Sequence, residues 1–253
     1  MTQPTLTDIP ALVQEYTHTL PALRLPAGHP DGRPFATWID HTLLKPEAEP
    51  AQILQVCAEA LRYRFASVCV NPLYAGLAAE QLRGSGVLTC VVVGFPLGAT
   101  LTAVKVTETR ACLEMGAQEI DMVLPVGLLR AGELEAVYAD ICAVGDAAHV
   151  KGAKLKVILE NALLDQVGKI RGCLLSQAAG ADFVKTSTGF GPGGATLEDV
   201  ELMRRVVGPE MQIKAAGGVR SLADARAFLA AGATRLGSSS GVKIMQELEN
   251  EGR

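Results

Sequence analysis

Two lysines lie inside short apolar runs of the sequence, where a charged side chain needs a special reason to be present. Lys185 lies in DFVKTSTGFG and Lys214 in MQIKAAGGVR. A lysine in a buried strand either forms a structural ion pair or points to the open end of a barrel. Two ammonium groups ~5 Å apart repel each other by roughly 3 kcal/mol, and burial further disfavours charge. The pKa of one of the two lysines is therefore expected to fall close to neutral pH, where its neutral amine can form a Schiff base, although chain order does not show which lysine this is.

Four further ionisable residues lie within or just after apolar runs. Asp121 in EIDMVLP needs either an ion-pair partner, such as Lys156, or a function in proton transfer, and the two interpretations are compatible. Lys156 and Glu160 share strand parity in KVILE, so both could face an interior. Asp40, in IDHTLLKP, ends the first run and is a candidate supporting group.

Two glycine-rich loops near the end of the chain have the composition of an anion site. AAGGVRS and RLGSSSG each follow an apolar run and precede a helical segment. A single Gly-Gly turn is most often only a turn, but glycines also let an anion approach the backbone amides at a helix N-terminus. The pairing of both loops predicts a phosphate site made of Gly217, Gly218, Gly237, Ser238 and Ser239.

Eight short apolar runs must position these residues, and helical segments separate them. Several runs are continuous rather than alternating, which is typical of parallel strands covered on both faces. Helices are predicted after several of them, two with Ser or Thr caps: Ala51–Tyr63, Leu101–Met115, Thr196–Val207 and Ser221–Ala230. The runs are Ala36–Ile39, Ala66–Val70, Thr89–Val93, Glu119–Leu124, Leu155–Leu159, Phe183–Thr186, Gln212–Ala215 and Thr234–Gly237.

Eight strand–helix units predict an α/β fold, a (β/α)8 TIM barrel over residues 36–253. An open doubly wound sheet is the alternative, but the count is eight and no GxGxxG opens the first unit. In a barrel, the polar residues at the C-terminal strand ends meet at one mouth. Residues 1–35 are predicted to be an N-terminal extension, with a helix over Thr7–Leu20 capped by Thr7 and then a proline- and glycine-rich linker.

Composition excludes several classes of function. The net charge of −4 and the 4 % aromatic content disfavour partners such as nucleic acid or a membrane surface. The uncharged stretch Gly84–Val104 contains Gly94, Pro96 and Gly98, which indicates a strand, a loop and a helix start rather than a membrane span. The four histidines are scattered, so no metal site is predicted. Six cysteines without CxxC spacing, Cys69 among them, indicate reduced core residues of a cytoplasmic protein.

Five motifs in order resemble those of the deoxyribose-phosphate aldolase family, over Ala36 to about Glu249. They are DHTLLKP, EIDMVLPVG, KVILE, FVKTSTGF and IKAAGGVR. The resemblance implies a class I aldolase, without metal or cofactor and commonly dimeric. Such an enzyme reversibly cleaves 2-deoxy-D-ribose 5-phosphate to D-glyceraldehyde 3-phosphate and acetaldehyde. It also implies that Lys185 forms the Schiff base, Lys214 assists it electrostatically and in proton transfer, Asp121 shuttles protons and Asp40 supports them.

The sequence departs from the family pattern at two points. Phe190 stands where some members carry a lysine that can bind phosphate, and the sequence ends in ENEGR, without the tyrosine that assists proton transfer in some members. Two alternatives remain open on sequence grounds: another lysine-dependent aldolase of a phosphosugar, and a non-catalytic barrel that binds one.

Overall fold

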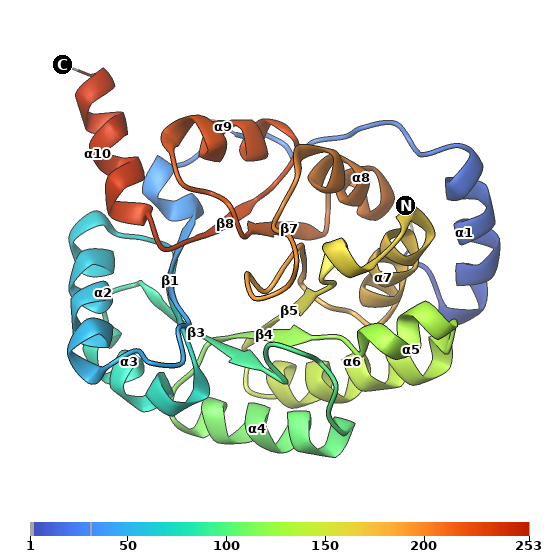
Figure 1. The fold of residues 1–253 in the computed structure, drawn as a ribbon, viewed down its shortest axis with the longest axis horizontal. Helices are drawn as coiled ribbons and strands as arrows, with labels where there is room; N and C mark the ends of the chain where they lie inside the picture. The colour runs from blue at the N-terminus through green and yellow to red at the C-terminus, as the bar shows by residue number, and fades with distance from the viewer. Residues whose placement is uncertain (1–2, 31, 253) are drawn as a thin grey trace.

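The computed structural model describes residues 3–30 and 32–252 and forms a closed parallel barrel. The strands pair in chain order and β8 pairs with β1, which excludes the open sheet. Figure 1 shows the strands around the centre and the helices outside them. The strands are β1 Ile39–Leu43, β2 Ser67–Val70, β3 Leu88–Val93, β4 Glu119–Val123, β5 Lys154–Ile158, β6 Phe183–Lys185, β7 Gln212–Ala216 and β8 Arg235–Ser238.

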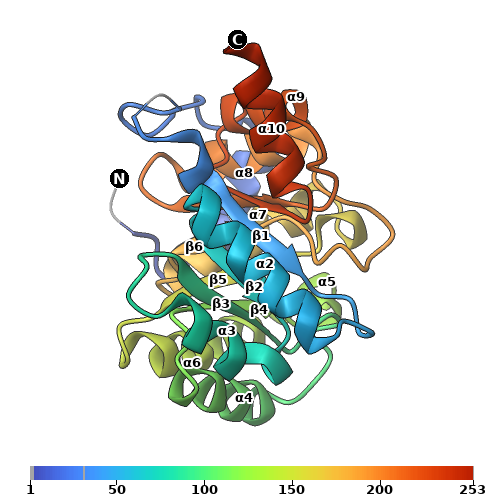
Figure 2. The ribbon, with the colours of Figure 1, turned by 90° about the vertical axis from the view of Figure 1, so that its left-hand side faces the viewer.

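Ten α-helices occur in the described residues, and those after β1 to β8 cover the outside of the barrel. Figure 2 shows α2 lying over β1 and β2, with α10 beside α9 at the end of the chain. The helices are α1 Ile9–His18, α2 Pro50–Tyr63, α3 Ala75–Leu82, α4 Thr102–Glu114, α5 Val126–Ala131, α6 Leu134–His149, α7 Gln166–Ala178, α8 Leu197–Val207, α9 Leu222–Ala230 and α10 Gly241–Glu251.

Seven of the eight predicted strands are confirmed to within one residue at each end, and the first is wrong. Phe35–Trp38 is a 3-10 turn, in which both the amide and the hydroxyl of Thr37 donate to the Pro34 carbonyl. These local hydrogen bonds compete with strand pairing, so β1 begins only at Ile39. Asp40 is therefore the second residue of β1, deep in the barrel, rather than the end of the first strand.

Hydroxyl caps fix the starts of the two late helices as predicted. The Thr196 and Ser221 hydroxyls accept from the amides of Asp199 and Asp224, both at 3.1 Å. The predicted cap at Thr7 is wrong, because Thr7 lies inside a 3-10 turn, Leu6–Asp8, that precedes α1. Proline is favoured in the first turn of a helix, where its missing N–H has no partner to lose, and Pro10 there places the start of α1 at Ile9.

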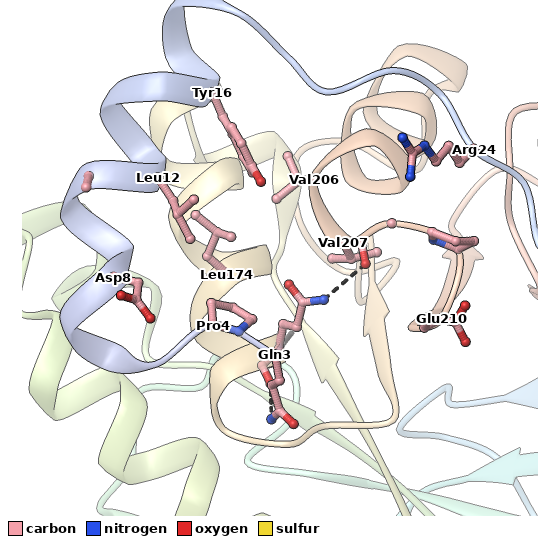
Figure 3. A pocket seen from close by; sticks show the side chains of 14 residues that line it. Gln3, Pro4, Asp8, Leu12, Tyr16, Arg24, Leu174, Val206, Val207 and Glu210 are labelled. Atoms are coloured by element: carbon pink, nitrogen blue, oxygen red, sulfur yellow. Dashed lines mark hydrogen bonds between the residues drawn. The ribbon is translucent and has the colours of Figure 1, made fainter. Parts of the chain in front are cut away.

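The described part of the extension packs on the barrel rather than standing apart from it. Ile9, Val13 and Tyr16 of α1 are buried in the main core, and α1 lies against α7. Beside α1 lies a cavity of about 590 Å³, lined also by the C-terminal ends of α7 and α8 (Figure 3). Residues 1, 2 and 31 of the predicted extension lie outside the described residues, and the division at residue 35 stays a prediction.

The uncharged stretch Gly84–Val104 forms a turn, β3, a loop and the start of α4, as its glycines and proline indicate. Within residues 3–30 and 32–252, no helix has both the length and the apolar character needed to cross a bilayer. Gly217 and Gly218 of the predicted phosphate site lie in the loop after β7, whereas Gly237 lies within β8, and the charged residues lie on the strands themselves.

Candidate active site

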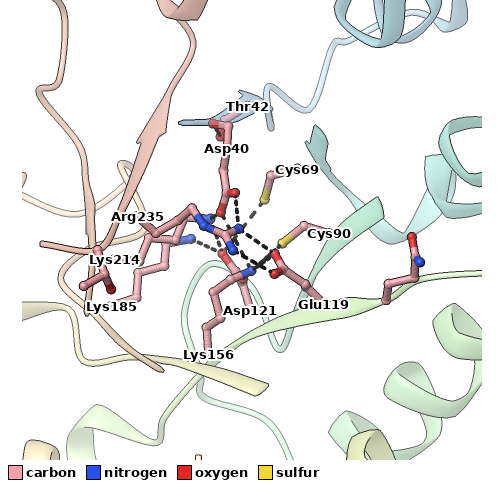
Figure 4. A network of polar contacts seen from close by, with 12 residues as sticks. Asp40, Thr42, Cys69, Cys90, Glu119, Asp121, Lys156, Lys185, Lys214 and Arg235 are labelled. Carbon is pink, nitrogen blue, oxygen red and sulfur yellow. Dashed lines mark hydrogen bonds and ion pairs between the residues drawn. The ribbon is translucent and has the colours of Figure 1, made fainter. Parts of the chain in front are cut away.

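Seven charged side chains from six strands converge inside the barrel, and each is at most 7 % exposed. Figure 4 shows them directed toward one another from around the barrel. Side chains two residues apart on a strand share a face, which places Glu119 beside Asp121. Strand register also puts Lys185 level with Lys214, and Asp121 level with Lys156. The seven are Asp40, Glu119, Asp121, Lys156, Lys185, Lys214 and Arg235.

The carboxylate of Asp121 lies at the centre of this network. Its Oδ2 accepts from Lys185 Nζ at 2.7 Å and from Lys214 Nζ at 2.8 Å. Its Oδ1 accepts from Lys156 Nζ at 2.7 Å. Burial alone would raise the pKa of Asp121, but the three ammonium groups outweigh burial and hold the pKa well below its ordinary value. Asp121 is thus an anion that bridges the two predicted catalytic lysines.

Asp40 is the second anion of the network and holds Lys214 from the other side. Lys214 Nζ lies 2.6 Å from Asp40 Oδ2, and Arg235 lies 2.6 Å from Asp40 Oδ1. Burial would raise the pKa of Asp40, but Arg235 and Lys214 outweigh it and lower the pKa. For Lys214 the balance is the reverse: burial would lower its pKa, but Asp121 and Asp40 raise it above the ordinary lysine value. Lys214 is therefore held as a cation between two carboxylates.

Glu119 and Arg235 were missed by the sequence argument, and both lie at the base of the network. Arg235 bonds both carboxylate oxygens of Glu119, at 3.0 and 3.2 Å, and Glu119 Oε2 lies 2.6 Å from Lys156 Nζ. The parity of Glu119 with Asp121 was a usable signal. Lys156 faces the interior as predicted, and its expected ion pair with Asp121 is present. Glu160 does not share this interior, because it lies past the end of β5 with φ 54°.

Two cysteines complete the surroundings of Asp121. Cys90 Sγ donates to Asp121 Oδ1 at 3.0 Å, and Cys69 Sγ lies 3.9 Å from Oδ2. Burial, and then the neighbouring Cys69 thiol, raise the pKa of Cys90, so it remains a thiol that can donate. Cys69, Cys90 and Asp121 form a group of potential metal ligands, but the carboxylate in it is already paired with lysines, which would repel a metal cation.

A cavity of about 300 Å³ opens at the C-terminal ends of the strands and reaches Lys185 and Lys214. Its walls are the loops that follow β1, β6, β7 and β8. All five predicted phosphate ligands line this cavity together with the two lysines: Gly217, Gly218, Gly237, Ser238 and Ser239. We call this cavity the mouth. The mouth is thus lined by both the predicted catalytic lysines and the predicted phosphate site.

The glycines of the predicted phosphate site have the geometry that close approach to a backbone requires. Gly217 and Gly218 have φ values of 84° and 103°, a region that disfavours side chains. A Cβ at Gly237 would lie 3.0 Å from Lys214 Cε. Ser238 Oγ donates to the Val219 carbonyl at 2.7 Å, so its hydroxyl connects the end of β8 to the loop after β7.

Two exposed cations, Lys45 and Arg220, also line the mouth and were missed as candidates from the sequence. Phe190 lies in the same wall, half exposed, and its ring packs edge-on against Phe95 with centroids 5.4 Å apart. The positive charge absent at Phe190 is thus available from other loops of the mouth.

Comparison with known proteins agrees with this geometry. The family model described as DeoC/LacD family aldolase matches residues 35–247. The chain belongs to this family. It is 56 % identical over 215 residues to the deoxyribose-phosphate aldolase of Streptococcus sanguinis, covering 85 % of this chain and 97 % of that one. The family is one of aldolases, which are carbon–carbon lyases, so this chain is an enzyme of that class.

Solved structures of relatives share the fold over nearly the whole chain. A crystal structure from Coccidioides immitis has a TM-score of 0.89 at 41 % identity and covers 98 % of this chain and all of its own. The deoxyribose phosphate aldolase of Aeropyrum pernix, described as a unique tetramer, has a TM-score of 0.81 at 34 % identity with the same coverage. Because these matches cover 98 % of the chain, they include most of the N-terminal extension.

Proposed function

We propose that this aldolase reversibly cleaves 2-deoxy-D-ribose 5-phosphate to D-glyceraldehyde 3-phosphate and acetaldehyde through a Schiff base on Lys185. The observation that carries the proposal is the pairing of Lys185 and Lys214 on one oxygen of Asp121, at the floor of a mouth lined by the residues of the predicted phosphate site. The substrate follows from relatives that are named deoxyribose-phosphate aldolase.

The charges inside the barrel favour Lys185 as the nucleophile. Four cations face three carboxylates there, so one positive charge is in excess. Among the described residues, Lys185 has a single carboxylate partner, Asp121, whereas Lys214, Lys156 and Arg235 each have two or more. If Lys185 gives up its proton, the positive and negative charges inside the barrel become equal in number, and only the ion pair with Asp121 is lost. The amine that remains can attack an aldehyde.

The reaction then uses groups that already touch one another. Lys185 Nζ adds to the C1 aldehyde carbon and water leaves, which forms an iminium. A base takes the proton of the C3 hydroxyl, the C2–C3 bond breaks, and its electron pair moves into the iminium as an enamine. Glyceraldehyde 3-phosphate departs; the enamine carbon is then protonated, and water releases acetaldehyde from Lys185.

Asp121 and Lys214 provide the proton transfers of this sequence. Because Asp121 Oδ2 contacts both Nζ atoms, a proton can pass between the two lysines through one carboxylate oxygen, with a water completing the path to substrate. Lys214, whose pKa is raised by Asp121 and Asp40 against the effect of burial, is the acid that can supply the enamine proton. Asp40 supports the relay by holding Lys214 in place.

We place the substrate phosphate on the loops of Gly217, Gly218, Gly237, Ser238 and Ser239. Their backbone amides precede α9 and α10, whose N-termini favour an anion. Lys45 and Arg220 add positive charge at the rim. The chemistry needs no metal, because the iminium is the electron sink that a Lewis acid would otherwise provide.

We further infer a cytoplasmic homodimer. The six cysteines are free thiols, which fits a reducing compartment. Leu97 and Leu101 are 74 % and 73 % exposed and offer apolar surface to a second copy. Sedimentation velocity at micromolar concentration tests the dimer, and a monomer would contradict it.

The substrate assignment is tested by the donor that the enzyme accepts in the synthetic direction. With D-glyceraldehyde 3-phosphate as acceptor, acetaldehyde is expected to give 2-deoxyribose 5-phosphate, whereas dihydroxyacetone phosphate gives no product. Turnover of dihydroxyacetone phosphate with no product from acetaldehyde would assign the barrel to a different phosphosugar aldolase. A barrel that binds the phosphosugar and turns over neither donor would be the non-catalytic alternative.

A further inference from the structure

Glu160 has a backbone conformation that the proposed mechanism does not explain. It follows β5 with φ 54° and ψ 62°, in the left-handed region that favours glycine. Arg64 is the other non-glycine residue with positive φ in the described residues, and it ends α2 as a helix C-cap. Glu160 ends no helix. A residue with a side chain keeps such a conformation when its surroundings require it there.

The side chain of Glu160 shows what holds it there. Glu160 is 3 % exposed, and its Oε2 accepts from the Thr188 amide at 3.2 Å and from the Thr188 hydroxyl. The same hydroxyl accepts from the Phe190 amide at 3.0 Å. The hydroxyl thus donates a hydrogen bond to the carboxylate and accepts one from the Phe190 amide. We call these three bonds the Glu160 latch.

The segment around Glu160 is fastened to the β6 side at further points. The amide of Leu159 donates to the Lys185 carbonyl at 2.9 Å, and the amide of Asn161 donates to the Thr186 carbonyl at 3.0 Å. Gly191 packs directly on the carboxylate, because a Cβ there would lie 2.8 Å from Glu160 Cδ. The chain after β5 therefore fixes the path of the chain from Lys185 to Gly191.

The segment that the latch holds is a wall of the mouth. Thr188, Gly189 and Phe190 line the mouth together with Lys185 and Lys214, whereas Glu160 itself does not line it. The Phe190 ring also packs edge-on against Phe95. A shift of Thr188 would thus move the wall that the substrate meets, without touching the reacting amines.

We propose that Glu160 is a positioning residue that fixes the Thr188–Phe190 segment as a wall of the substrate mouth. The proposal rests on the proposed function, since it takes the mouth above Lys185 as the substrate entrance. Glu160 acts through Thr188, so its loss is expected to weaken binding of the phosphosugar more than it slows the chemical steps.

The test is a double-mutant cycle between Glu160 and Thr188 on the purified full-length enzyme. Glu160→Ala is expected to raise KM for 2-deoxyribose 5-phosphate about tenfold, with kcat changed less than about threefold, because a charge-assisted hydrogen-bond pair is lost. Thr188→Val should raise KM by a similar factor. The double variant should show less than the sum of the two single effects, because both substitutions remove the bond between the Thr188 hydroxyl and Glu160.

Two variants separate this role from a general loss of structure. Glu160→Gln keeps an amide oxygen that can accept from Thr188, and its NH2 group takes the position of Oε1, which has no hydrogen-bond partner in the part of the chain that the structure describes. It should therefore restore most of the parental KM. Asp165→Ala is the control, because it removes another carboxylate from the segment between β5 and α7. The Asp165 carboxylate accepts from the Gly168 amide at 2.7 Å and does not line the mouth. It should lower thermal stability and leave KM unchanged.

Several results would overturn the latch. They are an unchanged KM in Glu160→Ala, additive effects in the double variant, or a fall in kcat alone. If Glu160→Ala does not fold, Thr188→Val and Glu160→Gln still decide the matter, since parental KM in Thr188→Val contradicts the proposal. Trapping of acetaldehyde on Lys185 by borohydride, run on every variant, distinguishes the two proposals. If the parent enzyme is not labelled on Lys185, the Schiff base is refuted. If the variants are labelled and keep the parental KM, only the latch is refuted.

Discussion

Replacement of Lys214 by leucine tests how the barrel makes a reactive amine. The variant removes one of the two ammonium groups on Asp121 Oδ2. It leaves Asp40 paired with Arg235, and Asp121 paired with Lys156 and Lys185, so no carboxylate is stranded without a cation. The variant should therefore fold, because the large penalty arises when a buried charge loses all its partners.

The magnitude follows from the distances to the shared oxygen. Lys185 Nζ and Lys214 Nζ lie 2.7 and 2.8 Å from the same oxygen, Asp121 Oδ2. The two nitrogens can therefore be no farther apart than the sum of these distances. Two unit charges ~5 Å apart at an effective dielectric constant of ~20 repel by roughly 3 kcal/mol. Without that repulsion the ammonium form of Lys185 is favoured, and the reactive amine falls about a hundredfold at pH 7.

The assay is the pH dependence of kcat/KM between pH 6 and 10 for the parent and Lys214→Leu. Lys169→Leu is the control, because Lys169 pairs with Asp199 outside the barrel and does not line the mouth. We expect a loss of about a hundredfold at pH 7 that is partly recovered toward pH 10, since higher pH restores the amine but not the proton that Lys214 relays. A flat profile about a thousandfold or more below the parent would refute the electrostatic account.

Three further outcomes are expected. Gly218 has φ 103° and open space for a Cβ, so Gly218→Ala should raise KM for the phosphorylated substrate roughly tenfold through backbone strain in the loop after β7. An unchanged KM would show that this loop does not bind the phosphate. Ile9→Ala should lower the free energy of unfolding by about 2–5 kcal/mol, because Ile9 is fully buried where α1 meets the core; chemical denaturation measures this, and a loss below about 1 kcal/mol would show that α1 only rests on the surface. Prolonged treatment with EDTA should leave turnover unchanged, and activity lost in EDTA and regained with zinc would show metal dependence.

Much of the barrel could be predicted because parallel strands covered on both faces leave a clear trace in the sequence. Seven runs of apolar residues matched strands, and the lysines inside two of them identified the site. The first strand was misplaced because Phe35–Trp38 is as apolar as a strand, while the local bonds of Thr37 make it a turn. That error put Asp40 at a strand end, although it lies deep in the barrel and pairs with Lys214.

The counterions of the site could not be deduced in full, because ion pairing across a barrel depends on register between distant strands. Arg235 and Asp40 are 195 positions apart in sequence yet 2.6 Å apart in space. The carboxylate of Asp121 lies between the Lys185 and Lys214 amines and offsets part of their repulsion, which the two lysine positions alone did not predict. The latch at Glu160 could not be predicted either, because nothing in the sequence indicates that a glutamate has a positive φ.

The central claim, a covalent intermediate on Lys185, is tested most directly by trapping. The enzyme is incubated with acetaldehyde and reduced with borohydride, and the modified peptide is mapped by mass spectrometry. We expect one ethyl group per active chain, on Lys185, and none on Lys156 or on Lys214, which two carboxylates hold as a cation. A label on Lys214 would reverse the roles of the two lysines, and an unlabelled enzyme that still cleaves substrate would contradict the Schiff base altogether.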